Sequence, residues 1–420
     1  QEHCMKYLIL HADGMADLAC AELGGSTPLQ AAKTPFLDQI AQRGEVGLLS
    51  LPSDAGRTGS DVTGVAVLGY DPKKYYPGPG PLEAAGLGVT VGEQDVVFRC
   101  TMVTVRGESA SGGTDRAADI KKLGPHVVME DATAGLIETE QARELVEAVN
   151  EQLGSESIQF YPGSGHRHLM VWVGGKSRAT CVDPQQLVGQ SIAEALPAGD
   201  GADVLRKIMD ASFFILRDHP VNEEREEDGL KPANCLWLWG QGRAPLWPPL
   251  PERYQVSGVV VSASDVHRGV GLCAGLDAAE LPAESGDESE TFAGCVKAVV
   301  QELAKKDFVY LHAGLSDDVL HATNVHDKVQ AIERFDAQVI GPILSALAKY
   351  PAYRLLVVCD PGLAKGQGSD VPPILYALCD GATQPPAGSS TRFHEQDKTI
   401  AGSAPRDATK LMMRLFPRGA

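Results

Sequence analysis

The first and last quarters of the chain alternate short apolar runs with amphipathic helical patterns. The expected strands are Tyr7–Leu10, Val46–Leu51, Phe308–Leu311, Arg354–Val358 and Ile374–Leu378, and the expected helices are Thr34–Arg43 and Lys328–Lys349. Pro35 in the first turn of the earlier helix fits its start. Strands that alternate with helices in this way predict an α/β fold, with a mostly parallel sheet covered by helices on both faces.

The middle of the chain has a different pattern. We expect strands at Asp95–Val105 and Cys235–Trp239, helices at Glu138–Leu153 and Gln190–Leu196, and a charge-rich exposed loop at Glu223–Lys231. We therefore interpret residues 96–254 as a second α/β domain. It is inserted into a discontinuous first domain made of residues 1–95 and 255–420.

Composition narrows the class of protein. With 43% hydrophobic and 22% charged residues, the 420-residue chain is typical of globular proteins of two or three domains. The net charge of −18 argues against nucleic-acid and membrane binding, and a phosphorylated substrate would need a local basic cluster. The nine cysteines are scattered singly, which favours reduced thiols in a cytoplasmic protein.

Two short segments carry most of the candidate chemistry. Asp13 lies just past the strand that ends at Leu10, and Ser60 lies between Gly59 and an expected helix at Val62–Leu68. In open α/β sheets, ligands bind outside the carboxyl ends of strands. A metal-binding carboxylate beside an activated serine is typical of phosphoryl-transfer enzymes. Each residue also has a structural alternative, because Asp13 could cap the following helix and Ser60 could be a helix N-cap.

Two later strand ends point to the same edge of the sheet. Asp317 and His321 follow the strand at Phe308–Leu311 with a spacing of four residues, which puts both on one side of a helical turn and lets them share a metal ion. Asp360 follows the strand at Arg354–Val358. An exposed helical pair and a turn residue are the respective structural alternatives. The convergence of four such segments on one sheet edge indicates a metal-dependent site more strongly than any one of them.

These residues belong to motifs through which the chain resembles a known family, and the resemblance extends along nearly the whole chain. The family is the archaeal-type, cofactor-independent phosphoglycerate mutases of the alkaline phosphatase superfamily. The matching motifs include Asp13-Gly14-Met15-Ala16-Asp17, Gly59-Ser60-Asp61-Val62, Gly80-Pro81-Leu82-Glu83-Ala84, Phe160-Tyr161-Pro162-Gly163, His219-Pro220-Val221-Asn222 and Trp237-Leu238-Trp239-Gly240-Gln241-Gly242.

The resemblance implies an activity, a cofactor and a set of site residues. Members interconvert 3-phosphoglycerate and 2-phosphoglycerate through a phosphoserine, which would form on Ser60. Two divalent ions (manganese, magnesium or zinc) would activate that serine. One ion would be held by Asp13, Ser60 and Asp360, and the other by Asp317 and His321.

The inserted domain would hold the glycerate. Its Arg167, His168 and Arg225 match the expected basic cluster, and Arg268 lies where the family often has lysine.

The chain also departs from the family pattern. Pro361 stands where a histidine ligand normally follows the aspartate, and residues 362–369 contain no second histidine, with Gln367 the nearest polar side chain. Each ion would therefore lose one imidazole. His312, His326, Lys365 or a water are the candidate replacements, although we expect His312 in a strand and His326 one turn too far along. Leu136 stands where relatives usually carry a polar or basic residue.

These departures leave three hypotheses open. The chain is a phosphoglycerate mutase with a rearranged metal site, or it is a catalytically impaired homologue that binds a phosphorylated metabolite or a protein partner. The third hypothesis is phosphatase action or phosphoryl transfer to another small acceptor. The first is favoured by retention of five site residues: Ser60, Asp13, Asp317, His321 and Asp360. Loss of both histidines favours the second.

Overall fold

A computed structural model describes residues 5–52, 59–108, 114–115, 120–281, 287–316, 319, 324–361, 372–381 and 391–417. The chain divides into two compact units, Gln1–Tyr76 with Leu246–Ala420, and Pro77–Pro245. The insertion thus begins and ends earlier than the predicted 96–254. The reason is that helix α5 (Pro79–Leu87) packs on strands β3 and β8 of the inserted unit.

Within the described ranges, none of the helices is both long and apolar enough to cross a membrane.

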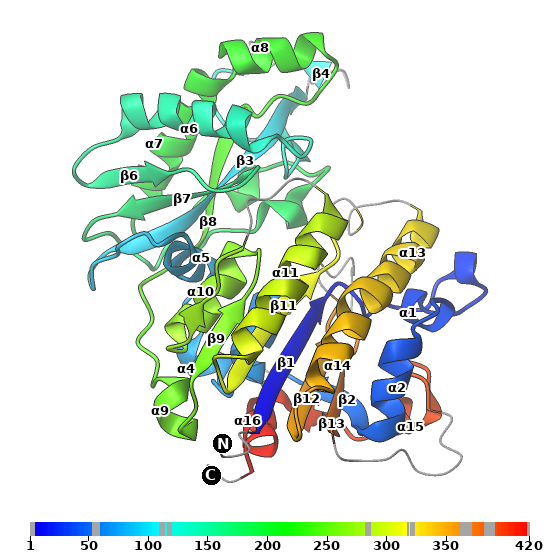
Figure 1. Cartoon of the computed structure of the whole chain (residues 1–420). Coiled ribbons are helices and arrows are strands. Elements are labelled where there is room, and N and C mark those ends of the chain that lie inside the picture. Colours follow the sequence, from blue (N-terminus) through cyan, green and yellow to red (C-terminus); the bar gives the residue numbers. More distant parts are fainter. Residues whose placement is uncertain are drawn as a thin grey trace. The chain divides into compact units, whose positions relative to one another are not determined.

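The first unit is built on an eight-stranded sheet, which confirms the predicted α/β class with a mostly parallel sheet (Figure 1). Its strands in spatial order are β10 (Asp277–Ala278), β9 (Gly258–Val261), β11 (Phe308–Gly314), β1 (Lys6–Asp13), β12 (Tyr353–Cys359), β13 (Ile374–Asp380), β2 (Glu45–Ser50) and β14 (Arg406–Asp407). Only β13 runs antiparallel to its two neighbours, while the other pairs are parallel.

The two faces of the central strands differ in character. Leu8, Leu10 and Ala12 of β1 belong to a large apolar cluster together with residues of helices α11 (Glu288–Leu303) and α13 (Val325–Phe335). Figure 1 shows these two helices lying across that face of the sheet. Successive residues of a strand point to opposite faces. His11 therefore points to the other face of the sheet.

The other helices among the described residues of this unit are short. They are α1 (Pro28–Ala31), α2 (Pro35–Arg43), α3 (Ser60–Val67), α4 (Pro72–Tyr75), α9 (Leu250–Tyr254), α10 (Asp265–Cys273), α14 (Gly341–Leu347), α15 (Lys398–Ala401) and α16 (Leu411–Leu415). The single helix predicted over Lys328–Lys349 is interrupted by a π-helical turn at Asp336–Ile340. In that turn the buried carboxylate of Asp336 accepts hydrogen bonds from the backbone N–H groups of Phe36 and Leu37, at the start of α2.

The inserted unit has its own sheet and its own apolar core. Its strands are β3 (Val96–Glu108), β4 (Thr114–Asp115), β5 (Val127–Asp131), β6 (Ile158–Tyr161), β7 (Arg167–Trp172) and β8 (Cys235–Gly242), and its longer helices are α6 (Thr139–Leu153) and α7 (Ala202–Leu216).

Two predictions for the inserted unit are wrong. The segment predicted as a loop at Glu223–Lys231 begins within helix α8 (Pro220–Glu227), because Pro220 at the first helical position and the His219 side chain cap its start. The helix predicted at Gln190–Leu196 is only a 3₁₀ turn at Ala193–Ala195.

Candidate active site

The predicted catalytic serine is the first residue of helix α3. Gly59 is the N-cap and no side chain caps this end, so Ser60 does not have the capping role that was its structural alternative. Its hydroxyl is almost completely buried and lies 3.1 Å from His267 Nε2 and 3.5 Å from His11 Nε2. The geometry therefore places a serine oxygen against two imidazole nitrogens.

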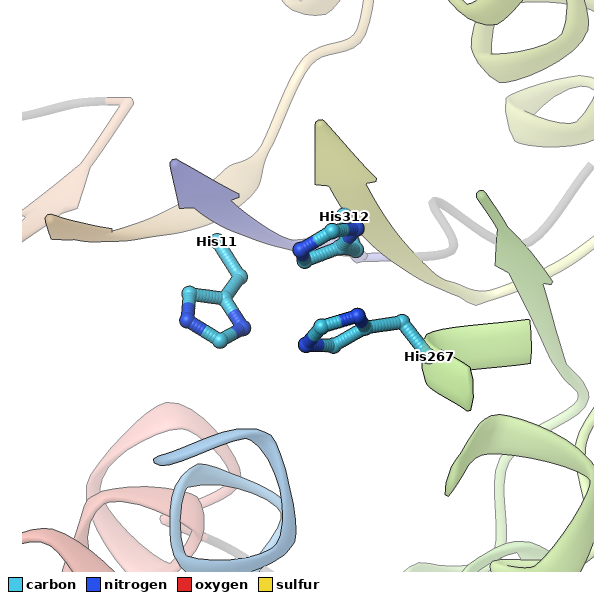
Figure 2. A group of neighbouring side chains, drawn as sticks. All are labelled: His11, His267 and His312. Carbon is cyan, nitrogen blue, oxygen red and sulfur yellow. The ribbon is translucent and has the colours of Figure 1, made fainter. Parts of the chain in front are cut away.

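Three buried histidines come together at this serine. His11 lies on β1, His312 lies opposite it on the neighbouring strand β11, and His267 lies on α10. One donor atom from each ring lies within 4.8 Å of the others. Figure 2 shows the three rings gathered with one nitrogen of each turned toward the other two. The rings of His267 and His312 are stacked with centroids 3.4 Å apart.

A hydroxyl group lies within hydrogen-bonding distance of the Nδ1 atom of each imidazole. His11 Nδ1 lies 3.0 Å from the Tyr310 hydroxyl. His267 Nδ1 lies 3.1 Å from Ser264 Oγ, and His312 Nδ1 lies 3.1 Å from Ser262 Oγ. Partners of this kind fix the orientation of a histidine ring.

The two predicted carboxylate ligands lie beside the histidines. Asp13 ends β1, and its Oδ2 is 3.6 Å from His312 Nε2. Asp360 follows β12, and its buried Oδ2 is 2.9 Å from His11 Nε2. The backbone N–H of Asp360 donates to the carbonyl of Ala12, and the N–H of Ala16 donates to the carbonyl of Asp360. These bonds tie the two strand ends together.

Burial and mutual repulsion control the charges in the cluster. Burial lowers the pKa of His267 far below its ordinary value, and the nearby His312 and His11 lower it further. Burial and His11 have the same effect on the pKa of His312. Burial alone would raise the pKa of Asp360, but the charge and hydrogen bond of His11 lower it overall. At neutral pH, His267 and His312 are therefore neutral and Asp360 is ionised.

These residues have the chemistry of a metal site. Neutral imidazole and ionised carboxylate are the protonation states that bind divalent ions. His312 Nε2 is buried and makes no hydrogen bond to any described residue. A buried polar nitrogen without such a bond is unusual and suits a ligand position. The donor set of the cluster therefore fits a divalent metal ion.

Other parts of the predicted site lie outside the described residues. These are Asp317, His321, Lys365 and Gln367. Pro361 is described and buried directly after Asp360. Of the candidate replacement ligands, His312 is indeed in a strand but still joins the cluster, whereas His326 is exposed near the start of α13.

Two members of the predicted basic cluster are buried and hydrogen-bonded within the inserted unit. His168 is fully buried, and burial together with Arg167 lowers its pKa to about 3, so it carries no positive charge at neutral pH. Its Nδ1 accepts a hydrogen bond from the N–H of Gly163. Arg225 is also buried, and its guanidinium donates to the carbonyls of Lys231 and Ala134 and to the side chain of Gln141, which holds neighbouring loops together.

The other two arginines are partly exposed. Arg167 begins β7 in the inserted unit. Arg268 follows His267 on α10, and its buried Nε makes no hydrogen bond to the described part of the chain. Leu136, at the position where we expected a polar residue in relatives, is exposed with a left-handed backbone conformation at φ 56°.

Sequence reasoning missed His11 and His267 as site residues. A usable signal was present for His11, because it lies two positions before Asp13 and therefore on the same face of the strand. Nothing comparable singled out His267 within its helix.

The chain resembles known proteins over most of its length. Residues 41–222 match the family model described as 2,3-bisphosphoglycerate-independent phosphoglycerate mutase. A probable 2,3-bisphosphoglycerate-independent phosphoglycerate mutase of Geobacter sulfurreducens is 40% identical and covers 99% of this chain and 100% of that protein. The Methanosarcina barkeri enzyme of the same name is 38% identical over 85% of each chain.

Solved structures share the fold. A protein from Pyrococcus horikoshii superimposes with a TM-score of 0.69 at 23% identity and covers 99% of this chain and 98% of its own. The cofactor-independent phosphoglycerate mutase of Thermoplasma acidophilum gives a TM-score of 0.56 at 24% identity and covers 99% of this chain and 100% of its own. Full-length identity of 40% to the Geobacter protein, together with the matched family model, establishes the relationship. The chain belongs to the family of 2,3-bisphosphoglycerate-independent phosphoglycerate mutases.

Proposed function

We propose that this chain interconverts 3-phosphoglycerate and 2-phosphoglycerate through a phosphoserine formed on Ser60. The observation that carries the proposal is the position of the Ser60 hydroxyl at the start of α3, against two imidazole nitrogens and close to the carboxylate held by His11. The first backbone N–H groups of a helix favour a phosphoryl group at this position.

The proposed reaction has two balanced half-steps. Ser60 Oγ forms a bond to phosphorus as the bond from phosphorus to the glycerate oxygen breaks. The serine proton ends on that glycerate oxygen. In the return step the other hydroxyl of the glycerate attacks the phosphoserine, and its proton returns to Ser60. No external acceptor or phosphate donor is consumed.

Members of this family generally depend on divalent metal ions. We propose Asp13, Ser60 and Asp360 as ligands of one ion, and Asp317 and His321 as ligands of another. Such an ion, when bound, lowers the pKa of the serine hydroxyl and offsets the negative charge of the phosphoryl group. Pro361, where the family normally has a histidine, means that the site cannot be assembled in the usual way.

The substrate of this reaction is a small phosphorylated metabolite, and the proposed mutase reaction requires no protein partner. Arg167 and Arg268 are the proposed substrate-binding cations, because His168 is neutral and Arg225 is engaged with backbone carbonyls. The eight described cysteines are free thiols, which fits the reducing cytoplasm as the compartment in which the enzyme works.

The test uses the purified full-length chain with added divalent metal ions. The protein is incubated with 3-phosphoglycerate, and formation of 2-phosphoglycerate and of the phosphoenzyme is measured. Ser60→Ala is the test variant, and Ser289→Ala, which alters an exposed helix serine, is the matched control. We expect turnover and phosphoenzyme in the wild type and the control, and neither in Ser60→Ala.

Other outcomes would select one of the remaining hypotheses. Binding of phosphoglycerate without turnover or phosphoenzyme would identify a catalytically impaired homologue. Phosphoenzyme that releases inorganic phosphate, or passes it to a different hydroxyl compound, would identify an altered phosphotransferase. Equal turnover in Ser60→Ala would overturn the phosphoserine mechanism.

A further inference from the structure

The three clustered histidines share one arrangement. In each of them Nδ1 faces a hydroxyl group, of Tyr310, Ser264 or Ser262. In each of them Nε2 faces the interior of the cluster, where its neighbours are Ser60 Oγ, Asp360 Oδ2 and Asp13 Oδ2. Three rings from three separate elements therefore each turn one nitrogen toward the interior of the cluster (Figure 2).

This arrangement is compatible with the tautomer that metal-binding histidines use. A hydroxyl oxygen can accept a hydrogen bond from Nδ1–H, and in that tautomer the lone pair of Nε2 is directed at the interior. Metal-binding histidines commonly donate their outer ring N–H to a neighbouring oxygen in this way. One nitrogen of each ring lies within 4.8 Å of the others, but the rings of His267 and His312 lie in parallel planes 3.4 Å apart between centroids, so one of the two must turn for both to bind the same ion.

One of these nitrogens makes no hydrogen bond to a described residue. His312 Nε2 is buried, and Asp13 Oδ2 lies 3.6 Å from it, beyond hydrogen-bonding distance. His11 Nε2 lies 2.9 Å from the Asp360 carboxylate, to which the ring can donate a hydrogen bond while no ion is bound. The buried His312 nitrogen, which makes no hydrogen bond to a described residue, is the observation that points to a ligand at this place.

We propose that His11, His267 and His312 bind a divalent metal ion through their Nε2 atoms, with Asp13 and Asp360 as the neighbouring carboxylates. His11 and His267 would then supply imidazole to the ion beside Ser60, in place of the histidine that is absent at Pro361. The inference deepens the proposed function, on whose site it rests, and it adds histidines of this chain's own to the expected ligands Asp13 and Asp360.

The ligand chemistry also selects the class of metal. Imidazole nitrogen suits zinc, nickel and copper, whereas carboxylate and water oxygens suit magnesium and manganese. A site with three imidazoles therefore prefers a zinc-type ion to magnesium or manganese.

The experiment measures metal binding directly, without reference to activity. The full-length protein is stripped with a chelator and dialysed against Zn²⁺, Mn²⁺ or Mg²⁺, and bound metal is counted. Bound Co²⁺ is followed by its visible absorption, which reports its ligands. We expect tight binding of Zn²⁺ in preference to Mn²⁺ and Mg²⁺, and a Co²⁺ spectrum typical of nitrogen ligands.

Variants then identify the ligands. His267→Gln and His11→Gln should each weaken Zn²⁺ binding at least about 100-fold and change the Co²⁺ spectrum, because loss of an outer partner alone costs about 10–100-fold. His126→Gln, at an exposed histidine of the inserted unit, should bind like the wild type. Ser264→Ala touches no ion and should weaken binding about 10-fold through the orientation of His267 alone.

Several results would overturn the inference. One is Zn²⁺ binding that is unchanged in His267→Gln and His11→Gln, and another is the absence of Zn²⁺ binding in the wild type. If the histidine variants do not fold, unchanged Zn²⁺ binding and an unchanged Co²⁺ spectrum in Ser264→Ala and Ser262→Ala would also overturn the inference.

The experiments can reject the proposed metal site and the proposed function independently of each other. Histidine-dependent Zn²⁺ binding without phosphoenzyme would remove the mutase function but keep the metal site. Turnover in a protein whose metal binding does not depend on His11 and His267 would reject only the proposed metal site.

Discussion

Asp360 Oδ2 lies 2.9 Å from His11 Nε2, and both side chains are completely or almost completely buried. The two residues belong to neighbouring parallel strands and their ends, β12 and β1, which are far apart in sequence. Removal of one member of a buried pair leaves the other charge buried without a partner. This usually costs more free energy of unfolding than the intact pair contributes.

Removal of the Asp360 side chain should therefore destabilise the metal-free protein. We expect Asp360→Ala to lower the free energy of unfolding by about 3 kcal/mol. Asp360→Asn should cost only about 1 kcal/mol, because its amide oxygen can still accept a hydrogen bond from the His11 ring. Urea unfolding in the presence of a chelator measures both. Equal costs for the two variants would contradict the importance of this contact.

Gly64 lets helix α3 pack close to the histidine cluster. A Cβ at this position would lie 2.8 Å from the Tyr310 hydroxyl and 3.7 Å from His11 Nδ1. Overpacking costs about 1–3 kcal/mol, and the better helix propensity of alanine returns about 1 kcal/mol. We expect Gly64→Ala to destabilise the protein by about 1 kcal/mol in urea unfolding.

The Tyr310→Phe background provides the control for this prediction. It removes the atom that the new methyl group would meet, so Gly64→Ala should cost less in that background. A cost that stays the same in both backgrounds would show that the hydroxyl contact is not the cause.

Arg167 is the proposed substrate-binding cation of the inserted unit. We expect Arg167→Ala to weaken binding of 3-phosphoglycerate about tenfold whether or not the protein turns it over, because a charged hydrogen bond contributes about 1.5 kcal/mol or more. Calorimetric titration measures the affinity, with Arg143→Ala on the exposed surface of α6 as the matched control. Unchanged affinity in Arg167→Ala would exclude this assignment.

Asp131 anchors the loop that carries Leu136. Burial alone would raise its pKa, but the Lys231 ammonium and hydrogen bonds from Thr133 and Gly135 lower it from 3.8 to about 2. Because the folded-state pKa is below the unfolded-state value, the folded state binds fewer protons, and this contribution to stability is lost as the pH falls from about 4 to about 2.

We accordingly expect a pH-dependent effect of Asp131→Asn. The substitution should cost about 1 kcal/mol at pH 7, since Lys231 is partly open to solvent, and about half of that at pH 3. Urea unfolding at the two pH values provides the comparison. A cost that grows toward acid pH would contradict the sign of the pKa shift.

The sequence by itself determined the general fold and predicted several residues of the candidate site. The alternation of apolar runs and helices predicted the α/β class, and the ends of two strands singled out Asp13 and Asp360. The inference of the fold succeeds because strand and helix periodicity are local properties of a few residues. The family resemblance rested likewise on short motifs, and the comparison with known proteins confirmed it.

Only the tertiary structure decided how the histidines come together. His11 meets His312 because β1 and β11 are paired in one register, and a shift by one residue would turn either ring to the opposite face. His267 joins them because α10 packs beside α3. Burial lowers the pKa of His168 to about 3 and keeps the ring neutral, although the family resemblance placed it in a basic cluster. Strand order, register and burial arise from contacts between distant segments, which no local pattern along the chain specifies.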